Sequence, residues 1–180
     1  MDQQQIRQQL VAWLVDFVEK PNPMLNGWAP CPYARKARVT DRFDIQFATA
    51  SSLAATIASA AQQLDQRDVV AVCVDPKQIS AADLSHLVQQ LNDQLMPQDV
   101  LLLEDHPEDV EIINGVHMNF GACAIVFVQQ LSKINEASDQ LRAGGYYNCW
   151  SQENLDSVVS WRVNNSNDLL PNQSQSNSLS

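Results

Sequence analysis

The sequence predicts an α/β fold: a three-stranded, mainly parallel sheet flanked by helices, with an N-terminal helix and a long C-terminal helix. Three observations favour this class. Segments with strand-like patterns alternate along the chain with segments whose apolar residues recur at helical spacing. The run "VVAVCV" (69–74) is rich in β-branched residues without interruption, which is typical of a strand covered on both faces. Strands that alternate with helices favour right-handed crossovers between parallel strands.

The first helix is expected from Gln4 to Glu19, because apolar residues recur there every three or four positions. Asp2, followed by Gln5 three residues later, indicates a cap at its start. The string "KPNPMLNGWAP" contains three prolines and a glycine, so residues 20–30 are expected to form a loop. The apolar stripe of this helix consists of Ile6, Leu10, Leu14, Phe17 and Val18.

The string "FDIQFAT" (43–49) alternates apolar and polar side chains, which predicts the first strand. Ser51 or Ser52 is expected to cap the helix that follows, since a serine hydroxyl accepts hydrogen bonds from free backbone N–H groups. The second strand is the β-branched run at 69–74. The apolar stripe of the second helix consists of Leu53, Ile57, Ala60, Ala61 and Leu64.

The second half of the chain continues the alternation. Ser80 and Asp83 indicate a capped third helix, and "DVLLLED" (99–105) is the third strand. The segment 119–143 begins with the β-rich string "ACAIVFV", but an apolar stripe of helical spacing runs through all of it. We expect one long helix there, with a strand followed by a helix as the alternative. A short last helix is expected at about 152–161.

Length and composition limit what the protein can be. The chain has 180 residues and a net charge of −10, which argues against nucleic-acid binding because a phosphate backbone requires an excess of cations. We expect residues 1–162 to form a single α/β domain and residues 163–180, rich in Asn, Ser and Gln, to form a disordered polar tail. No apolar run is long enough to span a membrane and no secretion signal is visible, so a cytoplasmic location is expected.

The carboxyl ends of parallel strands share one edge of a sheet, where ligands of α/β proteins bind. The sequence therefore predicts a candidate site at that edge. Serines at a helix start suit an anion, and the acidic residues suit acid–base chemistry or a cation. The residues expected there are Ser51, Ser52, Asp75, Glu104, Asp105 and His106.

The string "LEDHPED" places His106 among four carboxylates. Nearby negative charge favours the imidazolium, so His106 could act as a general acid or base, assisted by Asp105. With Glu104 it could instead bind a metal ion, and His117 could complete that site if the intervening loop folds back. The remaining interpretation is a solvated acidic loop that leaves a strand without any site.

The string "CPYARKAR" places Cys31 directly before a proline and before three cations. Proline favours the first position of a helix, so Cys31 is expected at the cap, where the helix dipole stabilises a thiolate. Arg35, Lys36 and Arg38 would add positive charge and could hold an anionic substrate. The alternative is a capped turn with a solvated basic face.

Two resemblances rest on this string. Cys31-Pro32-Tyr33-Ala34 resembles the C-P-Y-C string of glutaredoxins, with Ala34 in place of the second cysteine, as in a monothiol version. The order of Trp13-Leu14, then Cys31 to Ala34, then His106-Pro107 is similar to an uncharacterised bacterial family known only as a domain of unknown function. That second resemblance spans roughly residues 10–140. It implies an α/β fold and a candidate Cys/His pair.

Three functions follow as hypotheses. The first is a thiol- and histidine-dependent enzyme for a small anionic substrate, with Cys31 as nucleophile or redox thiol and His106 as acid or base. The second is a non-catalytic accessory or protein-binding module, in which Tyr146, Tyr147 and Trp150 offer a docking surface. The third is a metal-binding protein based on His106 and its acidic neighbours. No nucleotide-binding motif is visible, and the sequence indicates no other cofactor.

Overall fold

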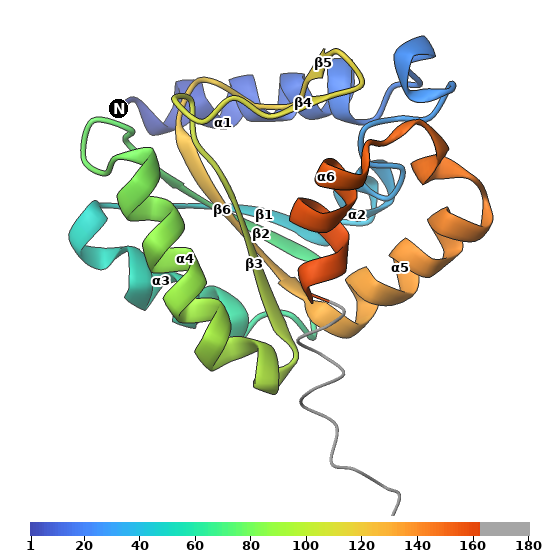
Figure 1. Ribbon diagram of the computed structural model, residues 1–180. Helices are drawn as coiled ribbons and strands as arrows, with labels where there is room; N and C mark the ends of the chain where they lie inside the picture. The colour runs from blue at the N-terminus through green and yellow to red at the C-terminus, as the bar shows by residue number, and fades with distance from the viewer. Residues whose placement is uncertain (163–180) are drawn as a thin grey trace, which may run out of the picture.

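The computed structural model describes residues 1–162, which pack around a four-stranded sheet in the order β1-β2-β6-β3 (Figure 1). Its strands are β1 (Phe43–Ala48), β2 (Val69–Val74), β6 (Ala124–Gln130) and β3 (Val100–Asp105). β1 is parallel to β2, whereas β6 is antiparallel to both of its neighbours. The α/β class is confirmed. The predicted three-stranded, mainly parallel sheet is wrong, because a fourth strand lies antiparallel between β2 and β3.

The segment 119–143 accounts for this difference. It forms strand β6 followed directly by helix α5 (Leu131–Ala143), so the prediction of one long helix is wrong and the alternative is correct. In β6, Ala124, Val126 and Val128 pack on one face of the sheet and Ile125 on the other. A strand buried on both faces is apolar at nearly every position, so a helical stripe can also be traced through it.

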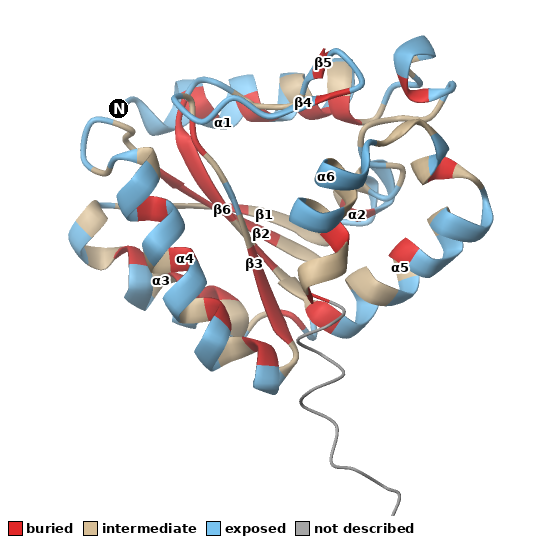
Figure 2. Ribbon diagram, in the orientation of Figure 1, coloured by how far each residue is buried: buried red, intermediate tan, exposed pale blue. Residues whose placement is uncertain are grey.

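Helices cover both faces of the sheet. α3 (Leu53–Ala61) and α4 (Ala81–Leu95) pack on one face, and α1 (Gln3–Trp13) crosses the other (Figure 1). Two further helices, α5 and the short α6 (Gln152–Leu155), lie toward the end of the sheet at which β6 finishes. Figure 2 shows that buried residues concentrate in β2, β3 and β6, so the sheet forms the centre of the core.

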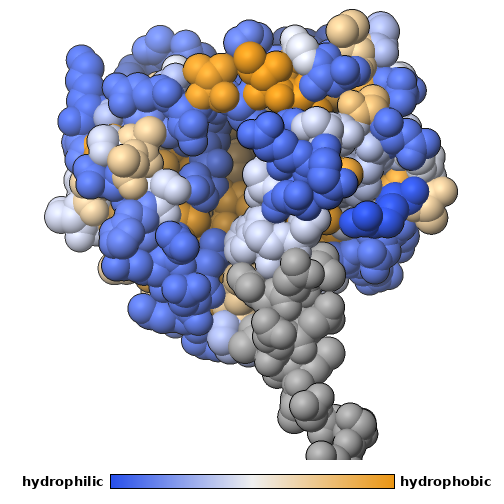
Figure 3. All heavy atoms as spheres, viewed as in Figure 1, coloured by the Kyte–Doolittle hydropathy of each residue, from blue (hydrophilic) through white to orange (hydrophobic). Residues whose placement is uncertain are grey.

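The remaining elements are short. α2 (Ala34–Val39) precedes β1, and β4 (Ile112–Ile113) pairs with β5 (Val116–His117) in a small hairpin. Figure 3 shows apolar side chains along the upper border of the face in view, over the hairpin, and in a hollow near its middle. Val110 and Ile112, beside and within the hairpin, are exposed. The single-turn elements are η1 (Leu14–Val18), η2 (Pro23–Leu25), η3 (Ala50–Ser52), η4 (Met96–Gln98), η5 (Tyr146–Cys149) and η6 (Asp156–Ser160).

Local signals explain where the helices begin. Asp2 accepts hydrogen bonds from the N–H groups of Gln4 and Gln5, and the Ser80 hydroxyl accepts one from Asp83, as expected. α5 is capped from a distance: the carboxylate of Asp99 accepts hydrogen bonds from the N–H and hydroxyl of Ser132, both at 2.7 Å. This carboxylate satisfies one backbone donor, the N–H of Ser132, that no helical carbonyl can reach.

The predicted tail, 163–180, lies outside the described residues. Within residues 1–162, no helix is both long enough and apolar enough to cross a membrane.

Candidate functional site

The carboxyl ends of β1, β2 and β3 lie at the same edge of the sheet. Ala48 pairs with Val74, Val74 with Ala124, and Asp105 with Ile125, so all three strands finish at the level where β6 begins. We call this side the carboxyl edge. It brings together the ends of the three strands after which the sequence predicted a candidate site.

At this edge the hydroxyl groups bond to one another and to the backbone. The Thr49 hydroxyl accepts a hydrogen bond from the N–H of Ser52, and the Ser52 hydroxyl accepts one from the N–H of Thr49. Ser51 lies 3.0 Å from the Thr49 hydroxyl. The capping role expected of Ser51 or Ser52 is therefore carried by Thr49 together with Ser52. The carboxylate of Asp75 forms an ion pair with the amino group of Met1 at 3.3 Å.

His106 is buried, with 2% of its surface exposed, and both of its ring nitrogens are engaged. Nδ1 accepts a hydrogen bond from the N–H of Glu108 at 3.1 Å, so the ring hydrogen lies on Nε2. Nε2 donates that hydrogen to the carbonyl of Ile79, also at 3.1 Å. This neutral tautomer fixes the loop after β3 to the loop before α4, and neither nitrogen remains for a metal ion or a reacting group.

The acidic neighbours of His106 hold the same loop. Asp105 accepts hydrogen bonds from the Asn119 side chain and from the N–H of Phe120, both at 2.8 Å. Burial raises the pKa of Asp105 above its usual value, although these two hydrogen bonds lower it. Loss of water likewise raises the pKa of Glu104. His117 is exposed on β5. In residues 1–162 no three His, Cys, Asp or Glu side chains gather as a metal site, so the structure does not assemble His106, Glu104 and His117.

Cys31 lies at the opposite edge of the sheet, where β1 and β2 begin and β6 ends. It lines a cavity together with Arg42, Val69 and Gln130, all of which belong to that edge. We call this side the amino edge. β1 spans the sheet with six residues, which places the two edges roughly 17 Å apart at about 3.3 Å per residue. The structure therefore does not bring Cys31 and His106 together.

The local environment of Cys31 also differs from the expectation. α2 begins at Ala34 rather than at Pro32, and the N–H of Cys31 donates to the carbonyl of Val18 at 3.0 Å. Although the residue is exposed, protein atoms crowd its thiol. The resulting loss of water raises the pKa of Cys31, whereas the backbone N–H groups of Tyr33 and Ala34 lower it and the charge of Glu19 raises it further. The thiol is thus the favoured form.

The three predicted cations after Cys31 have separate surroundings. Arg38 forms a bidentate ion pair with Glu19, at 2.6 and 2.8 Å, which joins α2 to the end of the first helix. Arg35 is exposed. Lys36 is exposed and lines the cavity that Cys31 also lines. Of these three cations, only Lys36 thus contributes to a shared site with Cys31.

That cavity has a volume of about 660 Å³. Its walls come from the end of the first helix, from α2 and from α5, and its floor from β1, β2 and β6. Apolar side chains dominate the lining. Tyr33, directly before α2, donates a hydrogen bond from its hydroxyl to Gln140 of α5 at 3.1 Å. The apolar lining residues are Trp13, Leu14, Val18, Ala34, Ala37, Phe43, Val69, Phe127, Ile134 and Ala137.

A π-helical turn shapes one wall. The first helix changes at Leu14 from α-helical to π-helical geometry, and Leu14 and Val18 of this turn line the cavity. Trp13, directly before the turn, stacks in tilted contact with Phe17 and Phe120. Such turns are frequent at functional sites, because the extra residue displaces side chains from the regular helical positions.

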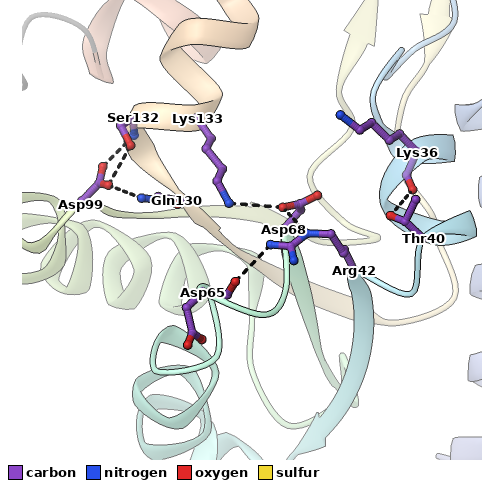
Figure 4. A network of polar contacts seen from close by, with 9 residues as sticks. All are labelled: Lys36, Thr40, Arg42, Asp65, Asp68, Asp99, Gln130, Ser132 and Lys133. Carbon is purple, nitrogen blue, oxygen red and sulfur yellow. Dashed lines mark hydrogen bonds and ion pairs between the residues drawn. The ribbon is translucent and has the colours of Figure 1, made fainter.

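Polar residues gather where the cavity meets the amino edge (Figure 4). Oδ1 of Asp68 accepts hydrogen bonds from Nε of Arg42 at 2.8 Å and from Nζ of Lys133 at 3.3 Å. Burial tends to raise the pKa of Asp68, but the two cations outweigh it and hold the pKa below its usual value. Asp68 is therefore ionised, and it links β1, β2 and α5.

The aromatic residues that could have formed a docking surface pack against one another. Tyr146 contacts Trp28, Tyr147 and Trp150 at ring-centroid distances of 4.9 to 5.7 Å. Its hydroxyl donates to the carbonyl of Pro30 at 2.6 Å, so the cluster fixes the loop that carries Cys31 to the end of α5. Tyr146 is buried, whereas Tyr147 and Trp150 are half-buried, so part of the cluster remains at the surface.

Sequence reasoning found Cys31 and Lys36 but missed the rest of the cavity. Asp68 and Lys133 lie in segments far apart in the chain, and no local pattern joins them. One signal was available: Arg42 and Asp68 each lie directly before a strand, and parallel strands bring such positions together.

In comparisons with known proteins, no family model, no curated protein and no solved structure matches this chain.

Proposed function

We propose that the protein binds a small amphipathic anion in the cavity between the first helix, α2, α5 and the sheet. The observation that carries this proposal is the cavity itself: its volume of about 660 Å³ falls within the roughly 300–1,000 Å³ typical of small-molecule sites. Like those sites, it combines an apolar lining with a few polar groups.

The floor favours an apolar body. Phe43 and Phe127 of the floor and Trp13 of the first helix line the cavity and are half-buried, so part of each side chain is exposed. Covering apolar surface contributes about 25 cal/mol per Å², and a flat or extended hydrocarbon group could cover these rings together. The affinity of such a ligand would therefore come mainly from burial.

The rim favours negative charge. Lys36, Arg42 and Lys133 line the cavity in a chain whose net charge is −10. A local excess of cations in an acidic protein attracts anions to that place, whereas the acidic remainder of the surface repels them. This supports the small anionic ligand that the basic residues after Cys31 suggested, with a different set of contacts.

The proposed function uses Cys31 as a wall residue and gives His106 a structural part. A thiol–imidazole reaction needs the two groups within hydrogen-bond reach, and they belong to opposite edges of the sheet. Binding is the function that the cavity supports without such a pair.

The test fills the cavity with a side chain. The fluorescent anion 1-anilinonaphthalene-8-sulfonate (ANS), which brightens in apolar sites, is titrated into the protein. Ala137→Trp places a large ring in the cavity, whereas Ala143→Trp, on the same helix and outside the lining, is the control. We expect Ala137→Trp to raise the Kd for ANS at least tenfold, and Ala143→Trp to leave it unchanged. Equal binding by both variants and the unaltered protein would contradict the proposal.

A further inference from the structure

We propose that the anionic group of the ligand is a single carboxylate and that it lies among the cations that line the cavity, Lys36 of α2, Arg42 and Lys133 of α5. This inference rests on the proposed function and adds to it the ligand's charged group and its seat. The two lysines lie on different elements, and both line the cavity. A carboxylate has two oxygens, so it can accept hydrogen bonds from more than one cation.

All three cations keep donors for a ligand. Arg42 donates from Nε to Asp68 at 2.8 Å and from Nη2 to the carbonyl of Asp65 at 3.3 Å, which uses two of its five N–H groups and fixes the guanidinium. Lys133 donates to Asp68 at 3.3 Å, which uses one of its three N–H groups. Lys133 therefore keeps donors for a ligand while Asp68 holds it in place.

Lys36 is another cation that would bind the carboxylate. Within residues 1–162, no carboxylate lies within ion-pair distance of its ammonium group. Its backbone carbonyl accepts the hydroxyl hydrogen of Thr40 at 2.7 Å, which fixes the start of the side chain. Figure 4 shows the Lys36 side chain extending from α2 toward the side on which Asp68 and Lys133 lie. A ligand anion would thus be its first charged partner.

The charge of the lining determines the charge of the ligand. The cavity is lined by the cations Lys36, Arg42 and Lys133 and by the carboxylates Asp68 and Glu136, which leaves a single positive charge in excess. One carboxylate neutralises that excess. A phosphate monoester carries about −1.5 to −2 at neutral pH, so it would leave net negative charge beside Asp68. The balance therefore favours a carboxylate over a phosphate.

The register of the sheet gives the direction in which the ligand would lie. Val69 pairs with Gln129 at the amino edge, and Ala71 pairs with Phe127 two positions further into the sheet. The carboxylate would lie at the edge, between the two helices, and the apolar body would extend inward over Phe127. Such a ligand would tie α5 to α2, which already share the Tyr33–Gln140 hydrogen bond.

The test compares three ten-carbon probes, decanoate, decyl phosphate and decanol, as competitors of ANS. We expect decanoate to compete at least tenfold more strongly than decanol and more strongly than decyl phosphate. Lys36→Gln should weaken decanoate about tenfold and leave decanol unchanged. Lys77→Gln, which removes an exposed lysine at the carboxyl edge, is the matched control and should change neither. Lys133→Gln should repeat the effect of Lys36→Gln. If Lys133→Gln also disturbs Asp68, Lys36→Gln alone decides.

Equal competition by decanoate and decanol, stronger competition by decyl phosphate, or an unchanged decanoate affinity in Lys36→Gln would overturn the carboxylate seat. Those results leave the cavity as a binding site. If none of the three probes displaces ANS and Ala137→Trp binds ANS normally, the proposed function itself fails.

Discussion

Asn92 protects the edge of the sheet at β3. Its buried side-chain amide donates to the carbonyl of Leu102 and accepts from the N–H of Leu102, both at 2.9 Å. Leu102 belongs to an edge strand, where these two groups face away from β6 and would otherwise lack a partner. The carboxamide of Asn92 thus takes the place of a neighbouring strand for one residue, and it blocks the pairing that exposed strand edges invite.

Replacing Asn92 by leucine should therefore destabilise the protein strongly. Two buried backbone groups lose their partners, at about 1–3 kcal/mol each, so we expect the free energy of unfolding to fall by about 2–6 kcal/mol. Urea denaturation followed by circular dichroism measures the loss. Gln94→Leu, on the exposed side of the same helix, is the control and should change stability little. If Asn92→Leu leaves the free energy of unfolding unchanged, water or another group must form hydrogen bonds with the carbonyl and the N–H of Leu102.

His106 and Cys31 illustrate what local sequence shows about single residues. The sequence identified both as unusual, and each has a specific environment. It could not show that the partners of His106 are backbone atoms of Ile79 and Glu108, because backbone groups are present at every position. Nor could it show that crowding outweighs the helix start at Cys31. Residue type indicates which chemistry a side chain can perform, whereas its neighbours decide whether it does.

At the level of elements, helices and strands with one buried face were predicted closely. The first helix, β1, β3 and α4 lie where the sequence placed them. β2, which is buried on both faces, has the predicted bounds because its run is short and rich in β-branched residues. β6 was missed because it continues directly into α5, so a helical stripe could be traced through both. Once it is read as a helix, the sheet loses its antiparallel strand, so one mistaken element changed the predicted topology of the whole sheet.

α5 is attached to the rest of the molecule more weakly than the strand before it. Leu131 and Ser138 are its buried residues, whereas most of β6 is buried. Segments with little burial open without global unfolding. We expect backbone amides in 134–143 to exchange with deuterium more than about tenfold faster than those in β6. Hydrogen-exchange mass spectrometry tests this, with α4 as the reference helix. Identical exchange in α5 and β6 would show that they open as one unit.

For the whole molecule, stability should depend on pH in two opposite ways. The pKa values of Glu104 and Asp105 are raised by loss of water, and that of Glu111 by loss of water and by the charges of Asp105 and Asp109. The folded state thus binds these protons more tightly than the unfolded chain does. Stability is gained as the pH falls from neutral through the raised pKa values.

Asp68 and Asp99 act in the other direction. Burial tends to raise their pKa values, but hydrogen bonds, with Arg42 and Lys133 adding charge at Asp68, outweigh it and hold both low. Their stabilisation is present above about pH 4, the value for an unfolded aspartate, and is lost as the pH falls through the lowered pKa values. The two groups of carboxylates together therefore predict a maximum of stability on the acid side of neutrality, above about pH 4.

Thermal unfolding at constant ionic strength from pH 3.5 to 8 measures this profile, with a higher Tm expected at about pH 5 than at pH 7.5. Glu111→Gln removes one of the raised carboxyl groups and should reduce the fall in Tm between those two values. A Tm that rises steadily up to pH 7.5 would contradict the assignment of the raised group.

The site shows where prediction from sequence stops for the whole molecule. Three parallel strand ends at one edge were expected, and the register places them there. The position of Cys31 was not predictable, because it depends on a loop whose path is set by contacts far away in the chain. The bond from Cys31 to Val18 and the bond from Tyr146 to Pro30 hold that loop at the amino edge.

The place of β6 has a consequence for how the chain folds during synthesis. β6 is the last strand of the sheet to leave the ribosome, yet it lies between β2 and β3 and provides the pairing for both. Until residue 130 has emerged, β3 has no partner strand in this sheet, and one side of β2 stays unpaired. The nascent chain therefore holds two open strand edges for the time needed to add about 25 residues, or on the order of 1–5 s at typical elongation rates. Assembly of the sheet must wait for its centre.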